Sequence, residues 1–273
     1  MTTHTVTGSG GIKLHVHEAG KPAGKSILFI HGFSQCCLVW SRQMNSDLAD
    51  TYRLVAMDIR GHGLSDSPDD AYGDSQIWAD DVHSVIEQLE LNKPLLIGWS
   101  YAGAIVSDYL GRYGEEEISG TNWVGAVCRL GEPLVAPGFL GEQFLAAVPG
   151  LFSRDVNDGV NAVKKLIDLC IPSGLTAEEK YLLLGLNMVV SPQVREALLS
   201  RNLENDSVVR QIRKPMLLSW GGEDAVVLLK MRDHIVGLAG HAQVSTYPGI
   251  GHAPFWQAAD RFNRELRAFR EEI

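Results

Sequence analysis

The sequence predicts an α/β protein: a mostly parallel β-sheet covered by helices on both faces, with a helical insertion between two of its strands. Short apolar runs alternate with longer helical patterns along most of the chain, and consecutive units of this kind build parallel sheets. The alternation stops between residues 131 and 211, where only helical patterns occur. A chain of 273 residues with 45% hydrophobic content is large enough to bury the core that this architecture needs.

The predicted strands are of two kinds. Segment 12–19 alternates apolar and polar residues, as a strand exposed on one face does. Most of the later segments are continuous apolar runs that end in glycine-containing loops, which is typical of strands buried on both faces. We expect these later strands within residues 26–32, 52–63, 94–100, 121–128, 214–222 and 242–249.

The predicted helices lie between these strands. Segment 74–90 places Trp78, Val82 and Val85 on one side, as an amphipathic helix does, and the helix after residue 100 ends at Gly114. We expect the remaining helices of the core at 40–50, 226–238 and 254–271. Residues 1–130 and 212–273 therefore form the predicted core domain, and residues 131–211 form a helical cap.

Composition and charge exclude several classes of partner. The net charge is −9 and no run of lysine and arginine occurs, which argues against a nucleic-acid partner. No stretch approaches 18 uninterrupted apolar residues, and the first residues lack the apolar segment of a secretory signal. We therefore expect a cytoplasmic protein with a small-molecule substrate and no membrane partner. The sequence does not decide the oligomeric state, and a homodimer is among the alternatives.

Cysteines and histidines give no metal-binding pattern. The four cysteines show no C-x-x-C spacing, and the adjacent Cys36 and Cys37 are interpreted as small apolar side chains. His15 and His17 point the same way on the first expected strand and could share a metal, but no third ligand is evident. We expect neither a metal nor another cofactor.

The stretch "LLIGWSYAGAIV" (95–106) places Ser100 where a buried strand gives way to a helix. Gly98 and Ala102, two residues to either side, leave the room that a sharp strand-to-helix turn requires. Such a turn strains the serine and lifts its hydroxyl to the carboxyl end of the sheet, beside the positive end of the following helix. Close packing of a helix on a strand is the alternative explanation for the small residues.

A serine hydroxyl needs a base to become a nucleophile, and two later loops supply the partners. His252 lies in "YPGIGHAPFWQ" after the last expected strand, and Asp224 lies in "LLSWGGEDAVV" after the strand before it. Both loops are expected at the same end of the sheet as Ser100, in the chain order Ser, Asp, His. Glu223 is the alternative acid.

An acyl-transfer site also needs donors for the oxyanion, which backbone N–H groups can supply. The expected donors are Tyr101, which follows the serine, and Phe33, in the loop "FIHGFSQ" after an early strand. His31 is interpreted as a histidine that orders this loop, and Trp99 as a wall of the core or pocket.

In this order, the segments "HGF", "DIRGHGLSD", "GWSYAG", "GGEDAVV" and "GHAPFW" resemble the α/β-hydrolase superfamily over nearly the whole chain outside the cap. The resemblance implies an eight-stranded sheet, a helical lid after the sixth strand, and a catalytic triad of Ser100, Asp224 and His252. Within the superfamily the chain is most similar to small bacterial carboxylesterases and the cofactor-free haloperoxidase or aryl-esterase group.

The expected reaction is hydrolysis of small to medium apolar carboxylic esters through an acyl-serine. Relatives that break carbon–halogen or epoxide bonds carry aspartate at the position of Ser100. Other reactions of the same triad stay open, namely carbon–carbon bond or lactone hydrolysis, perhydrolysis and hydroxynitrile cleavage, as does a ligand receptor with slow turnover. Apolar side chains of the cap and its surroundings are expected to line the substrate pocket: Trp40, Phe139, Phe144, Leu145, Val148 and Trp256.

Overall fold

The computed structural model describes residues 1–273 and contains the expected eight-stranded sheet. The strand order is β1-β2-β4-β3-β5-β6-β9-β10, in which β2 runs antiparallel to β1 and β4 and all other neighbours are parallel. The strands are β1 (Thr2–Thr7), β2 (Lys13–Gly20), β3 (Ser26–Ile30), β4 (Arg53–Met57), β5 (Leu95–Trp99), β6 (Gly120–Val124), β9 (Met216–Gly221) and β10 (Gln243–Tyr247).

Burial follows position in the sheet. Every residue of β3, β5, β6 and β9 is buried, as the continuous apolar runs predicted, because helices cover both faces at the centre. β1, with the sequence TTHTVT, is an edge strand that the sequence analysis did not identify, and only one of its residues is buried. Its pairing with β2 covers the edge that β2 would otherwise expose.

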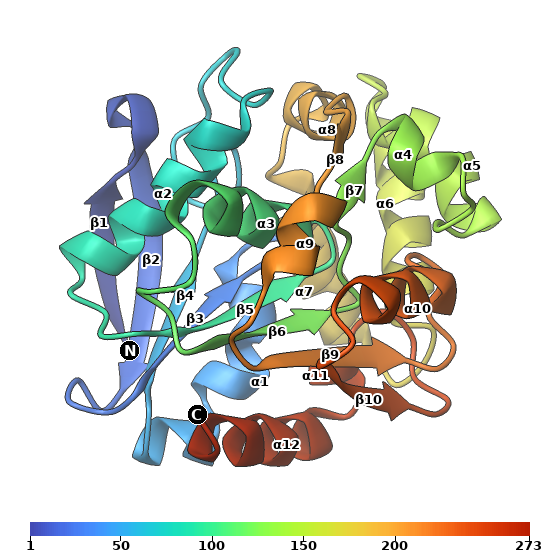
Figure 1. Ribbon diagram of the computed structural model, residues 1–273. Helices are drawn as coiled ribbons and strands as arrows, with labels where there is room; N and C mark the ends of the chain where they lie inside the picture. Colours follow the sequence, from blue (N-terminus) through green and yellow to red (C-terminus); the bar gives the residue numbers. More distant parts are fainter.

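Helices α2 and α3 cover one face of the sheet, and α1 and α12 cover the other (Figure 1). The expected helix at 40–50 is shorter, because two 3₁₀ turns, Cys37–Trp40 and Asp47–Asp50, flank a single α-helical turn. The helices of the core are α1 (Ser41–Met44), α2 (Ser75–Gln88), α3 (Ala102–Tyr113), α9 (Asp206–Gln211), α10 (Leu229–Leu238), α11 (Pro254–Gln257) and α12 (Ala259–Glu271). No helix is both long and apolar enough to span a lipid bilayer.

The helical insertion follows β6, the sixth strand of the sheet along the chain (Figure 1). A two-residue ladder between β7 (Arg129–Leu130) and β8 (Leu203–Glu204) joins the two ends of the insertion. Helix α9 lies within the expected cap range of 131–211 and packs against α3 and α10. The boundaries of the cap stay a prediction. The cap helices are α4 (Glu132–Val135), α5 (Glu142–Leu151), α6 (Val156–Cys170), α7 (Ala177–Met188) and α8 (Pro192–Leu199).

Candidate active site

Ser100 lies in the turn between β5 and α3 with a left-handed backbone conformation, φ 57°. This conformation is strained for a residue with a side chain, and backbone hydrogen bonds hold it. The Ser100 N–H donates to the carbonyl of Val124 at 2.9 Å, and the Ser100 carbonyl accepts from Gly103 at 3.0 Å and Val127 at 3.1 Å. The turn predicted from the sequence is therefore present, and the end of β6 supports it.

Small residues surround Ser100 because backbones approach closely there. A Cβ atom on Gly98 would lie 3.0 Å from the carbonyl oxygen of Ala102, and one on Gly32 would lie 2.9 Å from the Ser100 Cβ. At Gly103 an added Cβ would lie 2.5 Å from the carbonyl oxygen of Val127. Ala102 fits, fully buried, while Gly103 has no room for any side chain. The requirement for glycine at position 103 was not predicted from the sequence.

Asp224 and His252 form a buried pair at the carboxyl ends of β9 and β10. His252 Nδ1 donates to Asp224 Oδ2 at 2.7 Å. The other carboxylate oxygen, Oδ1, accepts from the backbone N–H groups of Val226 and Val227, each at 2.9 Å. These bonds leave Asp224 fully partnered and fix the imidazole with Nε2 on the opposite side. Glu223, the alternative acid, makes no hydrogen bond to His252.

The loop of His252 is fixed on both sides. The His252 N–H donates to the carbonyl of Cys170, the last residue of cap helix α6, at 2.9 Å. The indole N–H of Trp99, next to Ser100, donates to the His252 carbonyl at 2.9 Å. The remaining ring nitrogen, Nε2, is buried and has no hydrogen-bond partner. Nε2 is thus free to accept a proton from a group in the adjoining cavity, which Ser100 also lines.

The backbone N–H groups of Phe33 and Tyr101 donate no hydrogen bond within the chain. In the loop before Phe33, His31 Nε2 accepts from the backbone of Ile59 at 3.1 Å, so Nδ1 carries the proton and donates to the Gly32 carbonyl at 2.8 Å. Burial lowers the pKa of His31 well below its ordinary value, with a further contribution from a neighbouring histidine. His31 is therefore neutral and orders the loop, as its position indicated.

Ser100 and His252 share a cavity of about 30 Å³. This volume holds about one water molecule, so an ester needs more room than this cavity has. The wall is mostly apolar. The cavity is lined by Gly32, Phe33, Gln35, Trp99, Ser100, Phe144, Leu166, Cys170, Val226 and His252.

Of the six side chains expected to line a pocket, Phe144 lines this cavity and the other five do not. Trp40 is in the packed core, with its ring 4.2 Å from that of Phe255, and Trp256 lies under the guanidinium of Arg42. Phe139 packs 5.2 Å from the ring of His234. Leu145 and Val148, on α5, are half-buried in cap packing. An aromatic or aliphatic residue type does not reveal which face of its element it occupies.

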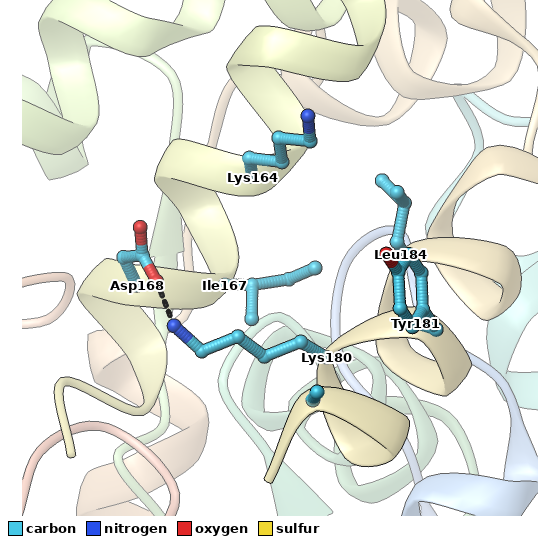
Figure 2. Close-up of a pocket in the computed structure, with 7 residues that line it drawn as sticks. Lys164, Ile167, Asp168, Lys180, Tyr181 and Leu184 are labelled. Carbon is cyan, nitrogen blue, oxygen red and sulfur yellow. Dashed lines mark ion pairs between the residues drawn. The ribbon is translucent and has the colours of Figure 1, made fainter. Parts of the chain in front are cut away.

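A larger cavity of about 320 Å³ lies on the outer side of the cap, between α6 and α7 (Figure 2). Ile167 and Tyr181 line it, and Lys180 pairs with Asp168 across it at 3.6 Å. Helix α6 separates the two cavities, because Leu166 and Cys170 line the inner one.

Two clusters hold side chains that can bind metals. His15, His17 and Cys37 bring their ligand atoms within 4.8 Å of one another, which supplies the third ligand that the sequence did not show. Hydrogen bonding to Cys36, burial and the charge of Asp58 raise the pKa of Cys37, so its metal-binding thiolate is strongly disfavoured. The absence of a metal stays a prediction.

The second cluster joins Cys128, Asp206 and His234. Arg129 pairs with both carboxylate oxygens of Asp206, from Nε at 2.8 Å and from Nη2 at 2.5 Å. Because the guanidinium already neutralises this carboxylate, the cluster is an ion pair at the base of the cap.

A strained strand-to-helix turn at Ser100, a buried Asp224–His252 pair and an eight-stranded sheet with a helical insertion together define a class of fold. The chain belongs to the alpha/beta hydrolase family, whose model matches residues 27–265.

Individual relatives are similar to this chain over nearly its whole length. An esterase from Rhodococcus sp. ECU1013, RhEst1, has a structure with a TM-score of 0.93 and 32% identity, covering 98% of each chain. A bifunctional esterase/perhydrolase from Acinetobacter calcoaceticus is 26% identical over 97% of this chain and 98% of its own. A non-heme haloperoxidase from Rhodococcus erythropolis is also 26% identical, with the same coverage. The chain is thus a hydrolase of this family with esterase-like and haloperoxidase-like relatives.

Proposed function

We propose that the protein hydrolyses small to medium apolar carboxylic esters through an acyl-enzyme on Ser100, with His252 as the base and Asp224 as its partner. The observation that carries this proposal is the buried His252–Asp224 pair: the Nε2 atom of His252 has no hydrogen-bond partner, and His252 lines the same cavity as Ser100. A serine with a neighbouring base and two unused backbone donors is the set of groups that acyl transfer requires.

In the first half of the reaction, His252 Nε2 takes the proton of Ser100 as the serine oxygen attacks the ester carbonyl. The bond from the carbonyl carbon to the alcohol oxygen breaks, and His252 returns the proton to the departing alcohol. Asp224 Oδ2 accepts from Nδ1 throughout and stabilises the charged imidazole. The N–H groups of Phe33 and Tyr101 stabilise the negative charge that develops on the carbonyl oxygen.

In the second half, His252 takes a proton from water, and the resulting hydroxide attacks the acyl-serine. Collapse of this intermediate releases the carboxylic acid and returns the proton to Ser100. Phe144, Leu166 and Val226 in the cavity wall favour an apolar acyl group over a charged or sugar-like one. Hydrogen peroxide is a second acyl acceptor, as the full-length similarity to an esterase/perhydrolase supports; attack by peroxide in place of water releases a peracid.

The test is turnover of p-nitrophenyl esters of increasing acyl length together with labelling by a fluorophosphonate. We expect rapid hydrolysis of short and medium chains, a label on the wild type, and neither result with Ser100→Ala. Adding hydrogen peroxide measures perhydrolysis as peracid formation. A folded wild-type protein that turns over no ester and takes no label would show that the proposal is wrong and would favour the ligand-receptor alternative.

A further inference from the structure

Arg195, on cap helix α8, is a buried cation with no acidic partner. Its side chain is fully buried and forms no ion pair with a carboxylate. Burial away from any opposite charge lowers the pKa of Arg195 to about 10. A buried charge without a counter-ion is costly, so its hydrogen bonds must be well made.

Those hydrogen bonds join three separate parts of the molecule. Arg195 Nε donates to Ser34 Oγ at 2.9 Å, Nη1 to the Leu151 carbonyl at 3.2 Å, and Nη2 to the Asn187 carbonyl at 2.6 Å. Leu151 is the last residue of α5, and Asn187 is in the last turn of α7. One guanidinium therefore connects two cap helices to the loop that contains Phe33.

Ser34 is the residue after Phe33, and its backbone is strained. Its φ of 60° is in the left-handed region, which serine adopts only when its surroundings impose it. The Ser34 N–H donates to His62 Nε2 at 3.2 Å, while His62 Nδ1 donates to the carbonyl of Arg60 at 2.9 Å. Arg195 thus holds the Ser34 hydroxyl from the cap side, and His62 holds its backbone from the core side.

Helix α8 also contacts the second proposed oxyanion donor. The Tyr101 hydroxyl donates to the carbonyl of Leu198, on α8, at 3.1 Å. It also accepts from Arg201 Nη1 at 3.4 Å, and Arg201 is paired with buried Asp108 at 2.6 Å. A single cap helix thus supports the residues on both sides of the proposed oxyanion hole.

We propose that Arg195 is a positioning residue that couples the seating of cap helices α5 and α7 to the conformation of the Phe33–Ser34 backbone. The inference rests on the proposed function, and it deepens it by assigning the geometry of the oxyanion hole to the cap. The consequence is that Arg195 acts on the transition state: its loss leaves ester binding nearly intact and slows acylation.

The experiment compares Arg195→Met with Arg270→Met. Arg270 is the control because it is also buried and donates to main-chain oxygens, those of Ile273 and Lys93. We measure kcat and KM for p-nitrophenyl butyrate, thermal unfolding, and inhibition by an alkyl trifluoromethyl ketone, which forms an oxyanion when a serine adds to it. Arg195→Met should lower kcat by about 10- to 100-fold, change KM less than threefold and weaken the ketone in parallel with kcat. Arg270→Met should lose stability alone.

Three further variants distinguish a role of Arg195 in positioning the Phe33–Ser34 backbone from a role in stability alone. Ser34→Ala removes only the hydroxyl and should lower kcat in the same way, which keeps the test available if Arg195→Met does not fold. Arg195→Lys should recover part of the loss, and the double variant of Arg195→Met and Ser34→Ala should be little worse than either single change.

The inference is overturned if Arg195→Met or Ser34→Ala retains wild-type kcat and ketone affinity, or if only KM and stability change. An active wild-type enzyme with an equally active Arg195→Met refutes the inference alone. A wild-type protein that neither hydrolyses esters nor reacts at Ser100 refutes the proposed function, and the inference with it.

Discussion

Replacing Gly125 with alanine tests whether the imidazole of His252 must stay where it is. Gly125 follows β6 with φ 49°, and a Cβ atom there would lie 2.9 Å from His252 Nδ1, 3.0 Å from His252 Cε1 and 3.1 Å from Asp224 Oδ2. The new methyl group would therefore press on the two groups joined by the 2.7 Å hydrogen bond.

The size of the effect follows from these distances. Comfortable carbon contacts are about 3.5 Å or more, so the imidazole must shift by roughly 0.5 Å. Because a misplacement of about 1 Å can cost 10²-fold in rate, we expect kcat to fall by about 10- to 100-fold. The left-handed backbone adds about 1 kcal/mol and the overpacking about 1–3 kcal/mol to the loss of stability.

The assay is kcat on p-nitrophenyl butyrate together with thermal unfolding. Gly10→Ala is the matched control, because Gly10 has φ 75° and no heavy atom within 4 Å of an added Cβ. This control should lose about 1 kcal/mol of stability and no activity. If Gly125→Ala matches Gly10→Ala in kcat, the imidazole tolerates the displacement and the reasoning from contact distances fails.

Three other predictions address the acid, the pocket and the dependence on pH. Asp224→Asn should lower kcat by about 10⁴-fold, whereas Glu223→Gln should stay near wild type; the opposite result in steady-state kinetics would assign the acid to Glu223. Phe144→Ala should raise kcat/KM for p-nitrophenyl hexanoate relative to acetate by about tenfold, because the side chain lines the cavity, and an unchanged ratio would place the acyl group elsewhere. Burial lowers the pKa of His62 in the folded protein to about 4, below the ordinary value of about 6.5 that applies to the unfolded chain. As the pH falls from 6.5 to 4, the unfolded chain therefore takes up a proton that the folded protein does not, and the free energy of unfolding should fall by up to about 3 kcal/mol. Urea unfolding should show a weaker pH dependence for His62→Gln, and an unchanged slope would argue against a neutral buried His62.

The positions of Ser100, Asp224 and His252 in the fold could be predicted because their surroundings constrain residue type, whereas their catalytic roles stay a proposal. Ser100 lies between small residues where a buried strand meets a helix, and His252 and Asp224 lie in loops after strands, so pattern and order together indicate acyl transfer. The central strands could be predicted for a similar reason, because burial on both faces selects continuous apolar runs. The polar edge strand Thr2–Thr7 lacks that signal and was missed.

The pocket and its supports could not be predicted, because they depend on which way a side chain points across the fold. Trp40 is as apolar as Phe144, yet one is in the core and the other in the cavity wall. Arg195 lies in the pattern "PQVREALLS", where an arginine is ordinarily exposed. Its partners are a serine hydroxyl and two main-chain carbonyls, which leave no complementary charge in the sequence to suggest burial.

Cys170 ends cap helix α6 and lines the cavity, and its carbonyl accepts a hydrogen bond from the backbone N–H of His252. The cap segment that lines this cavity therefore also holds the backbone of the proposed general base. A cap exchanged between relatives to change specificity would also replace the residue that makes this hydrogen bond, so a graft that ends before residue 170 and one that includes it should differ in turnover. A change of cap would therefore affect substrate selectivity and the position of His252 together, because the Cys170 carbonyl belongs to the cap and binds the His252 backbone.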